Sequence, residues 1–346
     1  MAICRALLLL LLVLSAAQGL AATAARNWDG PKDGPARQPG HYLVTYIAQD
    51  LRNGGIGGNY RAFASAARLL GWQIQVLDAQ GDNLLLRKAF ASAIASRSNG
   101  IILGGFEAAS LSAELAQAQR AHIVLVGWHA AARPGVVPGL FYNISTDPQE
   151  VARSAANHVI QQSRGSAGVV IFNDARFDIA NSKTRYMQEQ IQRCSGCKLL
   201  AIENIPINSA NQRMEGIVRQ LNQRYGRQWT HTLAINDVYF DEMNYPLLHA
   251  GRADIRNISA GDGSSKAITR IRAGLSQQVA TVAEPLGVQG WQLADEMNRA
   301  FANAKPSGYV SKPILLTRQL LQQLGNQEID AGLPYQQAYR AIWFAR

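Results

Sequence analysis

The chain alternates between short, continuous apolar runs and longer segments in which apolar residues recur every three to four positions. The runs, such as residues 42–47 and 100–103, are typical of strands buried on both faces of a sheet. The periodic segments, such as residues 60–70 and 84–96, are typical of amphipathic helices. This alternation predicts an α/β fold in which helices cover parallel sheets through right-handed crossovers.

A turn-rich break at residues 134–138 divides this rhythm into two halves, which predicts two doubly wound parallel-sheet lobes. The length of 346 residues agrees with about two domains. Predicted strands are residues 42–47, 72–77, 100–103, 123–126, 168–172, 199–203, 233–235, 255–260 and 279–282. Predicted helices are residues 60–70, 84–96, 111–120, 148–162, 180–192, 210–225, 240–250, 265–272 and 288–304.

The first 25 residues do not fit this pattern. One cation, Arg5, precedes an apolar stretch over residues 6–14, and Ala22-Thr23-Ala24 offers a cleavage site. This is the pattern of a secretory signal peptide over residues 1–24, with an uncleaved membrane anchor as the alternative. We therefore expect export to the periplasm. Residues 25–40, rich in proline, glycine and charge, are predicted to form a flexible leader.

Charge and cysteine content narrow the function classes further. The 34 basic and 24 acidic residues give a formal charge of +10, but the basic residues are scattered, which favours no nucleic-acid partner. After the leader only Cys194 and Cys197 remain, between a predicted helix and a predicted strand. We expect a small structural disulfide there, with a redox pair or half of a zinc site as alternatives. No second pair completes a zinc site, so no metal is predicted.

Polar residues follow the predicted strands repeatedly. Because parallel strands present their carboxyl ends to one edge, these residues should converge on a cleft and bind a polar molecule. Any one of them could instead cap a helix, and Trp128 and His129 could be packed residues. A glycine-rich loop at residues 54–58 lacks the order of a nucleotide-binding motif. The candidates from this pattern are Asn53, Trp128, His129, Phe177, Asn236, Asp262 and Glu284.

Signals for catalysis are weak. The sequence contains no G-x-S-x-G, H-E-x-x-H or S-x-x-K motif, and its six histidines form no pair with ligand spacing. Asp262 and Glu284 could act as an acid and a base, which leaves an exported enzyme as an alternative. We expect a binding protein that is not an enzyme and has no cofactor.

Several segments, in order, resemble motifs of one family. They are Val-Leu-Asp-Ala-Gln at 76–80, Asn-Gly-Ile-Ile at 99–102, Ile-Asn-Asp at 235–237, Gly-Asp-Gly at 261–263 and Thr-Val-Ala-Glu at 281–284. Over residues 42–317 the chain thus resembles the type I periplasmic substrate-binding proteins, the ribose/galactose-binding-protein-like branch of ABC transporter solute-binding proteins.

The resemblance implies a periplasmic-binding-protein-like I fold, with two lobes joined by three crossing segments and closing by a hinge. We expect the crossings near residues 140–146, 259–262 and 283–286, with residues 309–318 returning to the second lobe. The N-terminal lobe would then comprise residues 41–141 and 285–309. The C-terminal lobe would comprise residues 142–284 and 310–346.

The resemblance also implies roles for single residues. Asn53, Asn236 and Asp262 stand where the family binds sugar hydroxyls, and Lys183 stands near the position of a family arginine. Several positions depart from the family: Gly54, Gly55 and Ile56 replace aromatic residues, Trp128-His129 replaces Asp-Arg, and Glu284 replaces Gln. These departures leave sugar, polyol, furanosyl signal and amine open as ligands.

The expected function is that of an exported solute-binding protein, which captures a small polar molecule and delivers it to an ABC importer by hinge closure. The alternative is a periplasmic sensor component that presents its ligand to a histidine kinase or chemoreceptor. The partner would be an ABC permease or a membrane sensor protein, and a monomer is expected. A transcription regulator of related fold would need a DNA-binding segment where the signal peptide is predicted.

Overall fold

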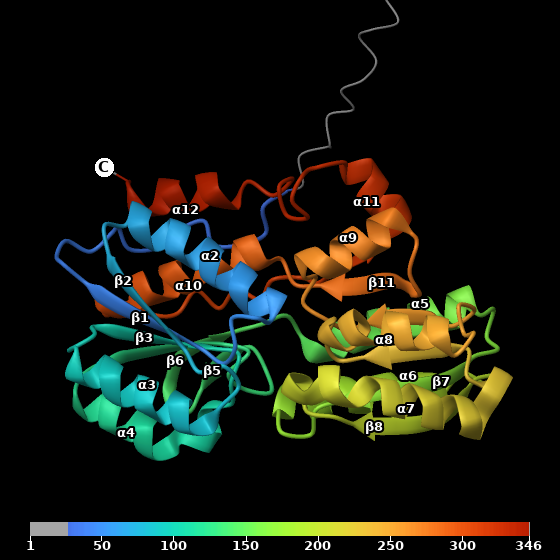
Figure 1. Ribbon diagram of the computed structural model, residues 1–346. Coiled ribbons are helices and arrows are strands. Elements are labelled where there is room, and N and C mark those ends of the chain that lie inside the picture. Colours follow the sequence, from blue (N-terminus) through green and yellow to red (C-terminus); the bar gives the residue numbers. More distant parts are fainter. Residues whose placement is uncertain (1–26, 346) are drawn as a thin grey trace, which may run out of the picture.

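The computed structural model describes residues 27–345, so the predicted signal peptide lies outside the described residues. Two α/β lobes lie side by side, each built on a six-stranded sheet (Figure 1). No helix within residues 27–345 is long and apolar enough to cross a membrane. The expected α/β class with two mostly parallel sheets is confirmed.

The first lobe has strand order β2-β1-β3-β4-β6-β5, in which only the β5–β6 pairing is antiparallel. Helices α2 and α10 cover one face of the sheet, α12 packs on α10, and α3 and α4 cover the other face (Figure 1). Its strands are β1 Leu43–Ala48, β2 Gln73–Asp78, β3 Gly100–Gly104, β4 Val124–Trp128, β5 Gly135–Val137 and β6 Leu140–Ile144. Its helices are α2 Gly54–Leu69, α3 Asn83–Ala95, α4 Ser112–Arg120, α10 Leu286–Phe301 and α12 Tyr335–Trp343.

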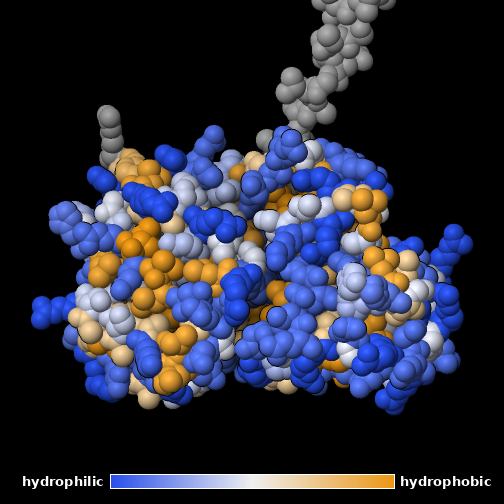
Figure 2. All heavy atoms as spheres, viewed as in Figure 1, coloured by the Kyte–Doolittle hydropathy of each residue, from blue (hydrophilic) through white to orange (hydrophobic). Residues whose placement is uncertain are grey.

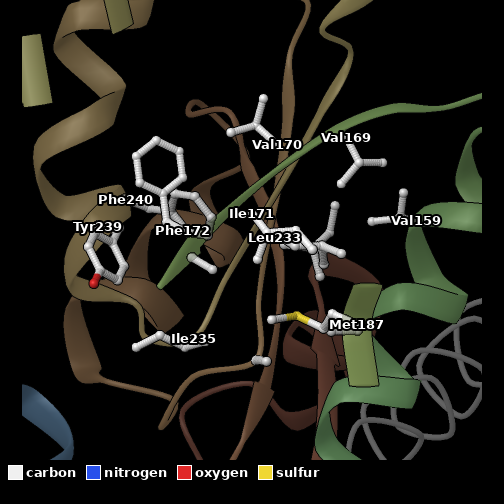
Figure 3. Packing of buried hydrophobic residues seen from close by; sticks show 14 of the residues in the cluster. Val159, Val169, Val170, Ile171, Phe172, Met187, Leu233, Ile235, Tyr239 and Phe240 are labelled. Carbon is white, nitrogen blue, oxygen red and sulfur yellow. The ribbon is translucent and has the colours of Figure 1, made fainter. Parts of the chain in front are cut away.

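The second lobe has strand order β12-β11-β10-β9-β7-β8, in which only the β11–β12 pairing is antiparallel. Figure 3 shows side chains from its central strands packing against those of flanking helices. Its strands are β7 Gly168–Asn173, β8 Lys198–Asn204, β9 His231–Ala234, β10 Arg256–Ser259, β11 Gln278–Ala283 and β12 Ile314–Thr317. Its helices are α5 Pro148–Gln162, α6 Asp178–Gln192, α7 Ala210–Tyr225, α8 Val238–His249, α9 Ser265–Ala273 and α11 Arg318–Leu324.

Local sequence signals set several helix ends near the cleft. The Asn53 side chain accepts hydrogen bonds from the backbone N–H groups of Gly55 and Ile56 and so caps α2. Asp147 caps α5 in the same way, with Pro148 at the first helical position. These caps fix where the chain turns from the end of a strand into a helix, and they place both turns at the edge where the lobes meet.

Four connections join the lobes, rather than the three expected. Residues 145–147, 284–285 and 310–313 cross between the sheets, and residues 325–334 lead from α11 back to the first lobe. The expectation of a crossing at residues 259–262 is wrong, because that segment joins β10 to α9 within the second lobe. The break at residues 134–138 forms β5, which pairs with β6.

The C-terminal helix α12 belongs to the first lobe, so the expected placement of residues 335–346 in the second lobe is wrong for this helix. The Trp343 ring stacks on Trp291 of α10 at 5.5 Å, and its Nε1 donates to Asp295 at 2.8 Å. A helix with a strongly apolar face docks where that face is buried, and local sequence does not say which lobe offers the site.

The segment expected to be a flexible leader is fixed against the first lobe from Asn27 onward. The Trp28 ring lies 5.4 Å from the Tyr309 ring and 5.6 Å from the Tyr339 ring. The backbone N–H of Arg37 donates to the Trp343 carbonyl at 2.9 Å. Aromatic packing of this kind offsets the entropy of ordering a proline- and glycine-rich segment.

The two cysteines lie in the predicted loop between α6 and β8. The sulfur atoms of Cys194 and Cys197 are 2.16 Å apart, within bonding distance. The pair is remote from the residues that line the cleft between the lobes, which agrees with a structural role.

Candidate ligand-binding site

Two adjoining cavities lie between the lobes, at the carboxyl ends of the parallel strands. The inner cavity has a volume of about 70 Å³ and the outer one about 200 Å³. In the space-filling view the lobes meet along a seam bordered largely by hydrophilic residues (Figure 2). Residues lining both cavities are Asn53, Ile56, Gly105, Phe177 and Ile207. Residues lining only the inner cavity are Trp128, His129, Ile179, Ala180, Lys183, Ile235, Asn236 and Asp262.

Seven of the eight predicted ligand-binding residues therefore meet in one place, and Glu284 is the exception. They come from both lobes: Asn53, Trp128 and His129 from the first, and Phe177, Lys183, Asn236 and Asp262 from the second. The rule that ligands bind beyond the carboxyl ends of parallel strands explains this convergence.

Asp262 and Asn236 form the polar floor of the inner cavity. Asn236 Nδ2 donates to Asp262 Oδ2 at 2.7 Å, and Lys183 Nζ donates to the Ala260 carbonyl at 3.0 Å. Burial raises the pKa of Asp262, while the nearby His129 and Lys183 oppose this effect. Asp262 thus accepts a hydrogen bond from Asn236 and lines the cavity beside it.

Asp237 holds the loop that carries Asp262. Its Oδ2 accepts hydrogen bonds from the backbone N–H groups of Gly263 at 2.9 Å and Ser264 at 3.2 Å, and its Oδ1 accepts from Gln278 Nε2 at 2.8 Å. In the sequence Asp237 belongs to the Ile-Asn-Asp motif and to the polar residues that follow a predicted strand, but it was not among the predicted ligand-binding residues. Its position after β9 was the available signal.

His129 lies between the inner cavity and Glu284, a residue of the interlobe connection at 284–285. Its ring stacks on the Trp128 ring at 4.2 Å with an interplanar angle of 18°, and its Nε2 lies 3.2 Å from Glu284 Oε1. Its φ of 51° is in the left-handed region, which is uncommon outside glycine and points to a constrained backbone. The ring thus has one face on Trp128 and one edge on the buried carboxylate.

Glu284 lies behind His129, in a network that ties three interlobe connections together. Thr146 Oγ1 donates to Glu284 Oε1 at 2.7 Å, and Gln289 Nε2 donates to Glu284 Oε2 at 2.5 Å and to Ser311 Oγ at 3.0 Å. Trp128 Nε1 completes the network by donating to Gln289 Oε1 at 2.8 Å. Thr146, Glu284 and Ser311 lie on three different connections between the lobes.

Glu284 was expected to contact the ligand, but its geometry favours a contact with His129 and the interlobe connections instead. Its side chain is 1% exposed and does not line the inner or outer cavity. Burial alone would raise the pKa of Glu284, but His129, Lys183 and Thr146 outweigh burial and lower it to about 2. The side chain thus acts as a fixed negative charge at the hinge.

The lobes approach closely over the cavity. A Cβ atom on Gly55 would lie 2.4 Å from Asp262 Oδ2, and one on Gly54 would lie 2.6 Å from the Ser264 Cβ. Across the outer cavity, Asn208 Nδ2 donates to the Gly81 carbonyl at 3.4 Å. The structure is thus a closed arrangement, in which the glycines at the start of α2 let the second lobe reach the first.

Sequence reasoning missed the outer cavity and the aliphatic part of the inner one. The charged residues of the outer cavity are largely paired, as for Arg176 with Asp174 at 2.6 Å and Arg52 with Asp50 at 2.7 Å. Asp50, Arg52 and Arg176 belong to the polar residues that follow predicted strands, but they were not chosen as ligand-binding residues. The missed lining residues include Asp50, Arg52, Arg176, Asn208, Asp241, Glu242, Lys266, Ile56, Ile179, Ile207 and Ile235.

Within residues 27–345, no group of three or more histidine, cysteine, aspartate or glutamate side chains could hold a metal ion. The arrangement of the inner cavity is suited to hydrogen bonding with a small molecule. A carboxylate, an amide, an imidazole and an ammonium group face it from two lobes.

Two lobes built on six-stranded sheets, joined by several crossing connections and with a polar cavity at their facing edges, are the fold of type I periplasmic binding proteins. The sequence matches the family described as periplasmic binding protein domain over residues 56–305, and the chain belongs to this family. Among curated proteins, none matches the sequence significantly.

Solved structures share the fold at low sequence identity. A sugar ABC transporter protein from Yersinia enterocolitica has a TM-score of 0.74 and 16% identity, covering 86% of this chain and 89% of its own. An ABC transporter solute-binding protein from Mycobacterium smegmatis with bound glycerol has a TM-score of 0.73 and 16% identity, covering 84% and 98%. An arabinose-binding component from a Shewanella species has a TM-score of 0.70 and 17% identity, covering 88% and 99%.

Proposed function

We propose that the protein is an exported solute-binding protein, which captures a small polar ligand such as a sugar or polyol between its lobes and delivers it to an ABC importer. The observation that carries this proposal is the cavity itself. Buried hydrogen-bonding groups from both lobes converge there, and the lobes have separate sheets that only connecting segments join, an arrangement that supports closure by a hinge motion.

The residues proposed to contact the ligand are those of the inner cavity. Asp262 would accept hydrogen bonds from hydroxyl groups, while Asn236 and His129 would each donate or accept. Trp128 and Phe177 offer ring surface to the ligand's carbon skeleton. Asn53 lines both cavities and caps α2, so it would link ligand binding to the position of the first lobe.

The similar structures support the ligand class and the partner. Their descriptions name ABC transporters and bound allitol, arabinofuranose, glycerol and myo-inositol, which are neutral polyhydroxy compounds. On this basis we propose a periplasmic location, an ABC permease as the membrane partner and a binding rather than an enzymatic role. The monomeric state stays a prediction from the family resemblance.

The test is ligand-induced stabilisation of the mature chain. A ligand that binds only the native state raises the melting temperature by mass action. We expect at least one neutral sugar or polyol, within a panel that also holds amines and amino acids, to raise the melting temperature of the wild type. Titration calorimetry then gives its affinity.

Two variants place the binding in the cleft. Asp262→Asn removes the buried carboxylate and should abolish most of the stabilisation. Glu215→Gln makes the same chemical change on the exposed face of α7 and should leave it unchanged. The proposed function would be contradicted if no compound of the panel raised the melting temperature of the wild type. It would also be contradicted if the ligand raised the melting temperature of Asp262→Asn as much as that of the wild type.

A further inference from the structure

Four isoleucines form an aliphatic wall in the inner cavity. Ile56 lies in α2, Ile179 in α6, Ile207 in a short 3-10 helix after β8, and Ile235 directly after β9. Ile56, Ile179 and Ile235 are buried and Ile207 is half-buried. These four residues, called the aliphatic wall below, thus come from both lobes and from four separate elements, and they line the same cavity as the hydrogen-bonding groups.

Packing of the lobe core does not account for Ile179. It is 8% exposed, yet the contiguous core of the second lobe includes its neighbour Ala180 and not Ile179. Its side chain is buried by the cleft rather than by the core. A buried isoleucine that faces a cavity fits an apolar part of whatever enters that cavity.

The charges around the cavity disfavour a charged ligand. A cation drawn to Asp262 would also meet the ammonium group of Lys183, which lines the same cavity. An anion would meet the side chain of Asp262, with the Glu284 carboxylate buried behind His129. With both signs already present, a neutral molecule enters at the lowest electrostatic cost.

Hydroxyl groups would be satisfied only where they meet the polar lining residues. Asp262 and Asn236 can exchange hydrogen bonds with them, whereas isoleucine side chains have no donor or acceptor. A hydroxyl pressed against the aliphatic wall would lose its water partners, at a cost of about 1–3 kcal/mol. A methyl or methylene group in the same place gains from burial instead.

The size of the inner cavity limits how much of the ligand lies there. Its volume of about 70 Å³ is roughly half of an engineered protein cavity of about 150 Å³ that holds benzene. The inner cavity therefore holds only a few carbon atoms. A longer ligand would extend past Phe177 and Ile207 into the outer cavity.

We infer that the ligand is a neutral, partly deoxygenated polyol, such as a deoxy sugar or a short diol. Its hydroxyl groups face Asp262 and Asn236, and its methyl or methylene group lies against Ile56, Ile179 and Ile235. This inference rests on the proposed function and adds a ligand class to it.

The experiment compares pairs of compounds that differ by replacement of a hydroxyl group with hydrogen. The pairs are L-fucose with L-galactose, L-rhamnose with L-mannose, and propane-1,2-diol with glycerol, each titrated calorimetrically into the wild-type mature chain. We expect the deoxygenated member of at least one pair to bind about 10- to 100-fold more tightly, the range over which an apolar pocket rejects an added hydroxyl.

A variant pair tests whether the aliphatic wall is the cause. Ile179→Thr introduces a hydroxyl into the wall and should lower the preference for the deoxygenated member at least threefold. Ile217→Thr makes the same change in α7, outside both cavities, and should leave the preference unchanged. An unchanged preference in a folded Ile179→Thr variant would overturn the inference. If this variant does not fold, the comparison of compound pairs on the wild type still tests the ligand class.

The outcomes separate this inference from the proposed function. If the fully hydroxylated members bind as tightly or more tightly, the ligand class is overturned and the solute-binding role stands. If no pair member binds but another compound of the wider panel does, the result is the same. If nothing in the panel stabilises the chain, both the ligand class and the proposed function fail.

Discussion

Replacing Glu284 by glutamine tests the hinge network most directly, because it removes one charge and keeps the shape of the side chain. In the folded protein the pKa of Glu284 is lowered from 4.5 to about 2, the net result of burial opposed by His129, Lys183 and Thr146. Each pKa unit corresponds to about 1.4 kcal/mol, so the ionised side chain contributes about 3 kcal/mol to folding at pH 7.

The sign of the pH dependence follows from the direction of this shift. A carboxyl group with a lowered folded pKa stabilises the protein above its unfolded pKa, and the contribution is lost as pH falls toward the folded pKa. We expect Glu284→Gln to lower the free energy of unfolding by about 3 kcal/mol at pH 7. At pH 3.5 the deficit should shrink to about 2 kcal/mol.

The assay is urea denaturation of wild type and variant at both pH values, followed by tryptophan fluorescence. A deficit that is the same at pH 7 and pH 3.5, or a variant as stable as wild type at pH 7, would refute the assigned role of the Glu284 charge. The distances to Thr146 and Gln289 would then describe contacts without a net energetic consequence.

Glu296 provides a comparison with the opposite sign of pKa shift; it lies in α10, the helix that begins two residues after Glu284. Burial raises its pKa to about 7, although Ser307 donates to it through its hydroxyl and its backbone N–H. A carboxyl group with a raised folded pKa loses stability as pH rises from 4.5 to about 7. Glu296→Gln should therefore gain on wild type over this interval, while Glu284→Gln does not.

Three further predictions concern the cleft and the disulfide. Gly55→Ala places a Cβ 2.4 Å from Asp262 Oδ2, so ligand affinity by calorimetry should fall at least about tenfold; Gly216→Ala, whose Cβ meets nothing within 4 Å, should not change it. Asp262→Ala and Trp128→Ala should each weaken ligand binding by about 1–3 kcal/mol, and unchanged affinity in both would contradict binding of the ligand in the inner cavity. Replacing both Cys194 and Cys197 by serine should lower the free energy of unfolding by about 2 kcal/mol, because the closed loop is short, and should leave ligand affinity intact; a loss of binding instead would argue for a functional disulfide.

Local signals predicted most of the secondary structure correctly. The predicted helix over residues 148–162 matches α5 in both bounds, because Asp147 and Pro148 mark its start in the sequence. The predicted break at residues 134–138 hid β5, since its pairing with β6 is a tertiary event that turn residues do not reveal. The convergence of Asp262, Asn236 and His129 followed from one topological rule, which needs strand order and no side-chain detail.

What the sequence could not predict depends on which surfaces meet. The sequence of α12 shows its apolar face. Whether that face packs on Trp291 or on the second lobe depends on the shapes of the two surfaces, which the sequence does not give. Glu284 follows a strand like the other candidates, and only the distances to Thr146 and Gln289 separate a hinge residue from a cavity residue. The isoleucine wall is assembled from four elements, and no spacing along the chain marks it.

The docking of α12 on the first lobe has a consequence for the order in which the chain folds. That lobe buries Tyr339 and Trp343 in the same core as residues of β1 and α2, so its core is complete only when the final helix is available. The second lobe is nearly continuous, from α5 to β11, and needs only β12 and α11 besides. The lobe that begins the sequence is therefore the last to finish folding, and a truncation that removes α12 would damage the N-terminal lobe first.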